Sequence, residues 1–146
     1  MRYDEALIGH WSSAPFDYGV MESSDLAFLP DGRGWGVLAN LAGMEVVRFR
    51  WHCPGPGLLE IRDEHYAQGQ WDVDTDGFSS VEETASAEYV TLSRYTIGPE
   101  EAAVGEPRQL TAVTFEETVM GAFVYARGAR EIEPTQDPSY SLFPYT

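Results

Sequence analysis

The chain has 146 residues, a length that suits one domain with a single core, and 43% of them are hydrophobic. It carries 24 acidic and nine basic residues, a formal net charge of −15, and every basic residue is arginine. The lack of lysine excludes lysine Schiff-base chemistry and a P-loop lysine, and the negative charge disfavours nucleic acid and anionic membranes as partners.

Targeting and redox features are few. No apolar run approaches the roughly 18 residues needed to span a bilayer, and residues 1–11 contain no long apolar segment of a secretory signal. Cys53 is the single cysteine, which rules out an internal disulfide. We therefore expect a soluble cytoplasmic protein, and since no phosphate loop or nucleophile motif occurs, we expect no cofactor.

Alternating apolar and polar residues recur along most of the chain, which indicates strands. An opening strand contains Trp11, and the pair Asp31-Gly32 predicts a hairpin between strands at 24–30 and 33–40. Further strands are predicted at 44–53, 57–63, 65–73, 85–97, 108–119 and 122–129. The acidic segment 74–84 and the segment 97–107 are expected to be loops.

This pattern predicts an all-β fold. About eight or nine strands with short, sequential connections favour an antiparallel up-and-down meander over residues 1–130, closed into a barrel or folded as a sandwich. Residues 131–146 form an irregular, Pro-rich tail that nevertheless contains Tyr140, Leu142, Phe143 and Tyr145. We expect this tail to pack on the barrel or on a partner, with a homodimer through the tail as one such arrangement.

The segment 44–53 has two distinct faces. Its odd positions are Val47, Phe49, Trp51 and Cys53, and its even positions are Val46, Arg48, Arg50 and His52. The odd positions make the better core face, so the cationic face is expected to point outward and form ion pairs. If it pointed into a barrel instead, the two arginines would bind a carboxylate or another anionic ligand.

Residues 72–83, DVDTDGFSSVEE, match the spacing of an EF-hand calcium loop through Asp72, Asp74, Asp76 and Glu83. An EF-hand needs a helix on each side, whereas the flanking residues here have no helical period. We therefore expect either a solvated acidic hairpin loop or a calcium-binding turn between strands.

The segment ALIGHWSS contains Gly9-His10-Trp11, which resembles the first signature of the lipocalin and wider calycin superfamily. The hairpin FLPDGRGWG and the strand FRW are also similar to small bacterial lipocalin-like domains. The resemblance implies an up-and-down barrel whose Trp11 closes one end, with Arg127 of the last strand packed across the indole.

Three functions remain open at this point. The first is a small binding protein that holds an apolar or weakly anionic ligand in the barrel cavity. The second is an enzyme of isomerase or cyclase type in the same cavity, and the third is an acidic interaction module for a cationic partner. The residues expected to contact the ligand are Trp35, Arg48, Arg50, Trp51 and His52.

Overall fold

The computed structural model describes residues 1–16, 22–72, 74, 77–103 and 105–143. Within these ranges the regular structure is nine strands and two short 3-10 turns. The strands are β1 (Gly9–Ser12), β2 (Glu22–Phe28), β3 (Arg33–Asn40), β4 (Gly43–Gly55), β5 (Leu58–Trp71), β6 (Phe78–Ser86), β7 (Val90–Glu101), β8 (Gln109–Val119) and β9 (Ala122–Arg127). The turns are η1 (Ala14–Phe16) and η2 (Pro134–Gln136).

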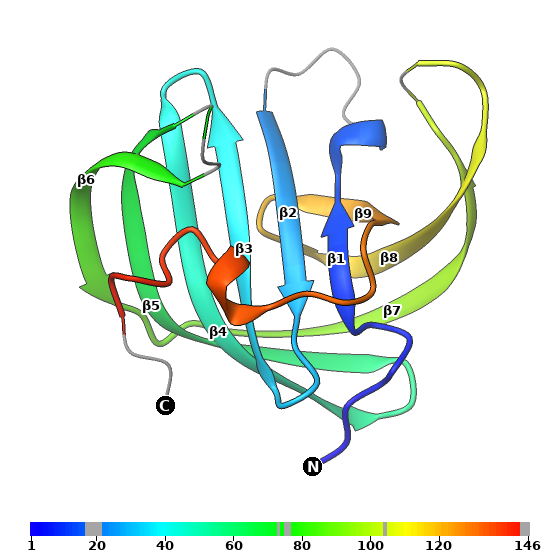
Figure 1. Ribbon diagram of the computed structural model, residues 1–146. Coiled ribbons are helices and arrows are strands. Elements are labelled where there is room, and N and C mark those ends of the chain that lie inside the picture. The colour runs from blue at the N-terminus through cyan, green and yellow to red at the C-terminus, as the bar shows by residue number, and fades with distance from the viewer. Residues whose placement is uncertain (17–21, 73, 75–76, 104, 144–146) are drawn as a thin grey trace.

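Eight of the strands close into an antiparallel barrel (Figure 1). Each strand pairs with its neighbour in the order β1, β2, β3, β4, β5, β7, β8, β9, and β9 pairs with β1 again. The strand β6 is outside this ring and pairs with the second half of β5. The predicted all-β fold with a closed meander is therefore confirmed, and closure leaves few free edges.

Three local predictions were wrong. The segment 97–107 is not all loop, because β7 continues to Glu101 and residues 97–101 pair with β8. The segments 57–63 and 65–73 form the single long strand β5, because a bulge beside Glu64 lets the chain continue and change its neighbour from β7 to β6. The acidic segment 74–84 is not simply a loop, since β6 begins at Phe78 and pairs with β5 while every residue from Ser79 to Ser86 is exposed. Such a solvated strand needs no apolar alternation, which is why its sequence gave no strand signal.

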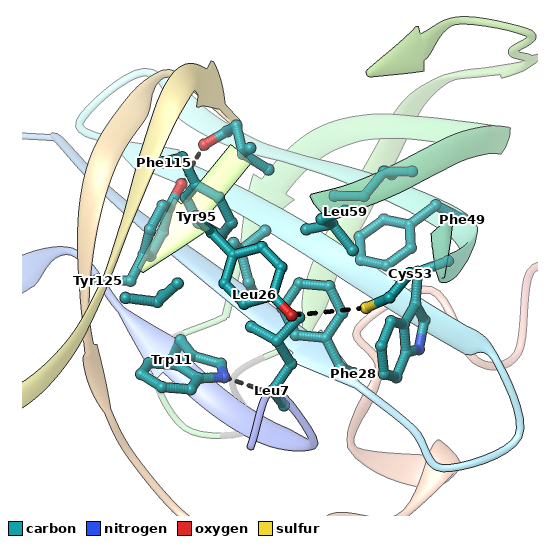
Figure 2. Close-up of a cluster of buried hydrophobic side chains, with 14 residues drawn as sticks. Leu7, Trp11, Leu26, Phe28, Phe49, Cys53, Leu59, Tyr95, Phe115 and Tyr125 are labelled. Carbon is teal, nitrogen blue, oxygen red and sulfur yellow. Dashed lines mark hydrogen bonds between the residues drawn. The ribbon is translucent and has the colours of Figure 1, made fainter. Parts of the chain in front are cut away.

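The inner face of the barrel holds the main core (Figure 2). Strand alternation turns Leu26 and Phe28 of β2 and Phe49 and Trp51 of β4 inward. They pack with residues of the opposite wall, of which Figure 2 labels Leu59, Tyr95, Phe115 and Tyr125. The rings of Phe28 and Trp51 meet edge to face with their centroids 5.1 Å apart, a favourable geometry for aromatic pairs.

Trp11 lies at the bottom of this core and is fully buried. Its indole N–H donates to the carbonyl of Leu7 at 2.8 Å, and the guanidinium of Arg127 lies 4.1 Å from the ring centroid. Arg127 also donates to the carbonyls of Ile8 and Ala6. Gly9 has φ of 124°, and a Cβ there would lie 2.6 Å from the carbonyl oxygen of Ala129, so only glycine fits.

The β8–β9 hairpin reaches across the barrel interior. Met120 and Gly121 both have positive φ (51° and 82°), as a two-residue type I′ turn requires. The carbonyl of Met120 accepts a hydrogen bond of 2.6 Å from the hydroxyl of Ser24 on β2. A Cβ on Gly36 of β3 would lie only 2.5 Å from the Met120 Cγ, so this side chain occupies space that the glycine leaves open.

Candidate ligand-binding groove

A second apolar cluster lies on the outside of the barrel wall. Strand alternation turns Ala27 and Leu29, Trp35 and Val37, and Met44 and Val46 away from the interior, and all six are buried. A strand that is apolar on both faces needs a cover on its outer side. The C-terminal tail provides this cover, because Ile132 packs against the cluster and the tail crosses in front of β1, β2 and β3 (Figure 1).

The tail is anchored on Arg48 of β4. The Arg48 Nε lies 3.0 Å from the Asp137 Oδ2, and the side chains are 4% and 0% exposed. The guanidinium also donates to the carbonyls of Ser139 at 2.9 Å and Phe143 at 2.7 Å. Because a buried arginine is tolerated only when it is paired and hydrogen-bonded, this set of contacts fixes where the tail docks.

Two further contacts extend the anchor. Asp137 accepts hydrogen bonds of 2.7 Å from both the backbone N–H and the hydroxyl of Ser139, so its carboxylate bridges β4 and the tail. The ring of Phe143 stacks on His65 of β5, with centroids 4.6 Å apart and an interplanar angle of 10°. The tail therefore packs on the outer face of β4 and β5 as well as on β3.

A pocket of about 790 Å³ lies on the outer wall, between the first strands of the barrel and the tail. We call it the outer groove. Apolar side chains dominate its lining, and a few polar groups converge on it, which is the usual character of a small-molecule site. Its lining residues are His10, Ala14, Glu22, Ser23, Asp25, Trp35, Val37, Ala39, Asn40, Leu41, Met44, Trp71, Ala129, Ile132, Gln136 and Pro138.

The polar groups of the outer groove are mainly acidic or neutral. Asp25 of β2 lies diagonally across from His10 of β1, and its Oδ1 is 3.7 Å from the His10 Nε2. The Glu22 carboxylate accepts a long hydrogen bond of 3.4 Å from the amide of Asn40. Glu22 is exposed and Asp25 is partly exposed, and none of the described residues that line the groove is an arginine.

One carboxyl group faces the barrel interior. Asp63 of β5 pairs with the inward-facing Phe49 and follows the core residues Leu59 and Ile61 at alternate positions. Burial raises the pKa of Asp63 to about 6. This group therefore changes its protonation state close to neutral pH, as an internal acid or base would need.

The five residues predicted to contact a ligand do not share one site. Trp35 lines the outer groove, Trp51 lies in the barrel core, and Arg48 is under the tail. Arg50 is exposed and pairs with Glu64 at 3.4 Å, and His52 lies 3.5 Å from Glu60. The cationic face of β4 thus points outward, which is the orientation that the sequence favoured.

Sequence reasoning did not identify most of the outer groove. Glu22 and Asp25 are on β2, Met44 is on β4 and Ile132 is in the tail, and these three segments are not adjacent in the chain. The sequence did contain one signal of a buried outer face. Trp35 and Val37 are large apolar residues on a strand whose opposite face carries Gly34 and Gly36. Such a strand buries its outer face, and the apolar tail was available to cover it.

The acidic loop lies between strands rather than helices, as expected. Asp72 and Asp74 lie in the β5–β6 connection, where the Asp74 N–H donates to the Asp72 Oδ1 at 3.0 Å, and Glu83 is on β6. Asp76 is outside the described residues. Among the residues that the structure does describe, no group of three or more His, Cys, Asp or Glu side chains is arranged to hold a metal ion.

Over the described ranges, the chain has no helix with the length and apolar character needed to traverse a bilayer. Comparison with known proteins found no matching protein-family model, no matching curated protein and no matching solved structure.

Proposed function

We propose that this protein is a small lipocalin-like barrel that binds a small, mostly apolar ligand in the outer groove. The observation that carries the proposal is the groove itself, a pocket of about 790 Å³ with an apolar floor of Trp35, Val37 and Met44. This volume lies within the range of roughly 300 to 1,000 Å³ that is usual for small-molecule sites.

The lipocalin-like assignment is supported by the contact between the Arg127 guanidinium and the buried Trp11 ring in an eight-stranded barrel. The lipocalin resemblance would place a ligand inside the barrel. Here the interior contains the aromatic core and the tip of the β8–β9 hairpin, so the outer groove is the better candidate.

The charge of the groove also revises the expected ligand. An anion in the barrel would have needed the cations of Arg48 and Arg50. Arg48 is held by Asp137 and two tail carbonyls, and Arg50 is exposed beside Glu64. An apolar ligand that tolerates nearby carboxylates fits the groove better.

The test uses Nile red, a neutral apolar dye, and a pair of matched substitutions. Ala39→Trp places a large ring in the groove, whereas Ala85→Trp places the same ring on the exposed strand β6. We expect saturable dye binding by the natural chain, loss of binding in Ala39→Trp and unchanged binding in Ala85→Trp. Circular dichroism and thermal melting of both variants check that the barrel is intact.

A dye that binds Ala39→Trp as tightly as the natural chain must lie outside the groove, and that result would refute the proposal. Absence of any saturable binding to the natural chain would also count against it.

A further inference from the structure

We propose that the ligand of the outer groove carries a positive charge, as an amine or quaternary ammonium group on an apolar body. This inference rests on the proposed function, because it names the chemical class that the same groove would select.

The charged side chains of the groove lining favour a cationic ligand. Asp25 and Glu22 lie near opposite ends of the strand segment that borders the groove on β2, and the part of the lining that the structure describes contains no arginine. His10, the basic partner of Asp25, is 3.7 Å away and is a cation only when it is protonated. An ammonium group bound here would gain a charge-assisted hydrogen bond that a neutral ligand cannot make.

Two tryptophan rings belong to the same groove lining as these carboxylates. Trp35 and Trp71 both line the groove, one on β3 and one at the end of β5. The indole ring is the best aromatic partner for an organic cation, and quaternary ammonium ligands are commonly held by aromatic side chains. Aromatic rings combined with carboxylates therefore favour a cation, and neither feature favours an anion.

The electrostatic field of the whole molecule also favours a cation. A formal net charge of −15 raises the local concentration of cations and repels anions at the surface. This effect is screened beyond about 8 Å at physiological ionic strength, so it assists encounter but cannot position a ligand. The contribution of Asp25 and Glu22 should consequently persist at 0.15 M salt, at which the test is made.

The test compares three probes of nearly equal shape by isothermal titration calorimetry: aminoadamantane, adamantanol and adamantanecarboxylate. The first is a cation at neutral pH, the second is neutral and the third is an anion. We expect the cation to bind roughly 3- to 30-fold more tightly than the alcohol, as an exposed charge pair and one contact with an indole ring would together produce. The carboxylate should bind most weakly.

Two double variants then separate the groove carboxylates from net charge. Asp25→Asn with Glu22→Gln removes the groove carboxylates, whereas Glu116→Gln with Glu117→Gln removes two exposed carboxylates on β8. Both change the net charge by the same amount. The preference for the cation should vanish in the first double variant and remain in the second.

Equal binding of the amine and the alcohol by the natural chain would overturn the charge inference while leaving the groove as an apolar site. A preference that survives in the first double variant would also overturn it, because net charge alone would then be the cause. If no adamantane probe binds and Nile red does not bind either, the proposed function fails together with this inference.

Discussion

Replacement of Asp137 by asparagine should destabilise the protein strongly, because it leaves Arg48 as an uncompensated charge beneath the tail. The Arg48–Asp137 pair has an N–O distance of 3.0 Å, and its side chains are 4% and 0% exposed. Removing one partner of such a pair typically costs about 3 to 5 kcal/mol. Since small domains are stable by only about 5 to 15 kcal/mol, this is a large part of the total.

The strand β4 offers a matched control two residues away. Arg50 pairs with Glu64 at 3.4 Å, but these side chains are 44% and 39% exposed. Glu64→Gln should therefore cost no more than about 1 kcal/mol, the usual value of an exposed ion pair. The contrast between Asp137→Asn and Glu64→Gln isolates the effect of burial, because both changes convert an acid to its amide.

Urea denaturation at pH 7, followed by tryptophan fluorescence, measures the free energy of unfolding of Asp137→Asn and Glu64→Gln, and thermal melting provides a second measure. A loss of about 3 kcal/mol should lower the melting temperature by roughly 10 °C for a domain of this size. The double replacement Arg48→Met with Asp137→Leu should recover only part of the loss. An apolar pair removes the unpaired charge of Arg48, but the backbone N–H and the hydroxyl of Ser139 lose Asp137 as their acceptor.

Local detachment of the tail would limit how much stability Asp137→Asn loses. If it detaches, Arg48 regains water and the loss cannot exceed the free energy of tail docking. Limited proteolysis should then cleave the tail of Asp137→Asn faster than that of Glu64→Gln. If the two variants have the same stability and the same cleavage rate, the buried pair does not anchor the tail and the reasoning is wrong.

Three further predictions concern the barrel interior. Asp63→Asn should stabilise the protein at pH 7 by about 1 kcal/mol, a value reduced because the carboxyl is only half buried. Since burial raises the Asp63 pKa to about 6, the natural chain becomes less stable as the pH rises from about 4 to 6 and the buried carboxyl loses its proton. Urea titrations at several pH values should show that the natural chain and Asp63→Asn have similar stabilities near pH 4. Gly36→Ala should cost about 1 to 3 kcal/mol because its Cβ would meet the Met120 side chain. Met120→Ala should relieve that loss in the double variant. If the effects of the two substitutions on the free energy of unfolding simply add, the contact is contradicted. Arg127→Met should cost about 2 kcal/mol and change the emission of Trp11, since the guanidinium covers the indole and binds two carbonyls; an unchanged unfolding midpoint would count against this role.

The fold class could be predicted from local chemistry. Alternation along 44–53 separates the inward Phe49 and Trp51 from the outward Arg48 and Arg50, and the structure keeps that division. The pair Asp31-Gly32 marks the turn before β3 because glycine adopts the positive φ of 88° that this position requires. Such signals depend on residues close in the chain, so they are visible in one sequence.

Strand boundaries were less well predicted where a strand is exposed to solvent or changes its pairing partner along its length. The segment Phe78–Ser86 is a strand only because β5 supplies its hydrogen bonds, and its exposed residues need no apolar pattern. The change of partner along β5 at Asp63–Glu64 likewise depends on which strands meet in space. Pairing partners are a property of the folded chain, and composition alone does not identify them.

What the sequence determined by itself was the two-faced character of the strands, the all-β meander and the acidic surface. Only the tertiary structure decided where a ligand could bind. Arg48 and Asp137 are 89 residues apart, and it is their pairing that brings the tail over Trp35 and forms one wall of the groove. Alternation shows that a face is apolar, but what covers that face depends on contacts between distant segments, which carry no local signal.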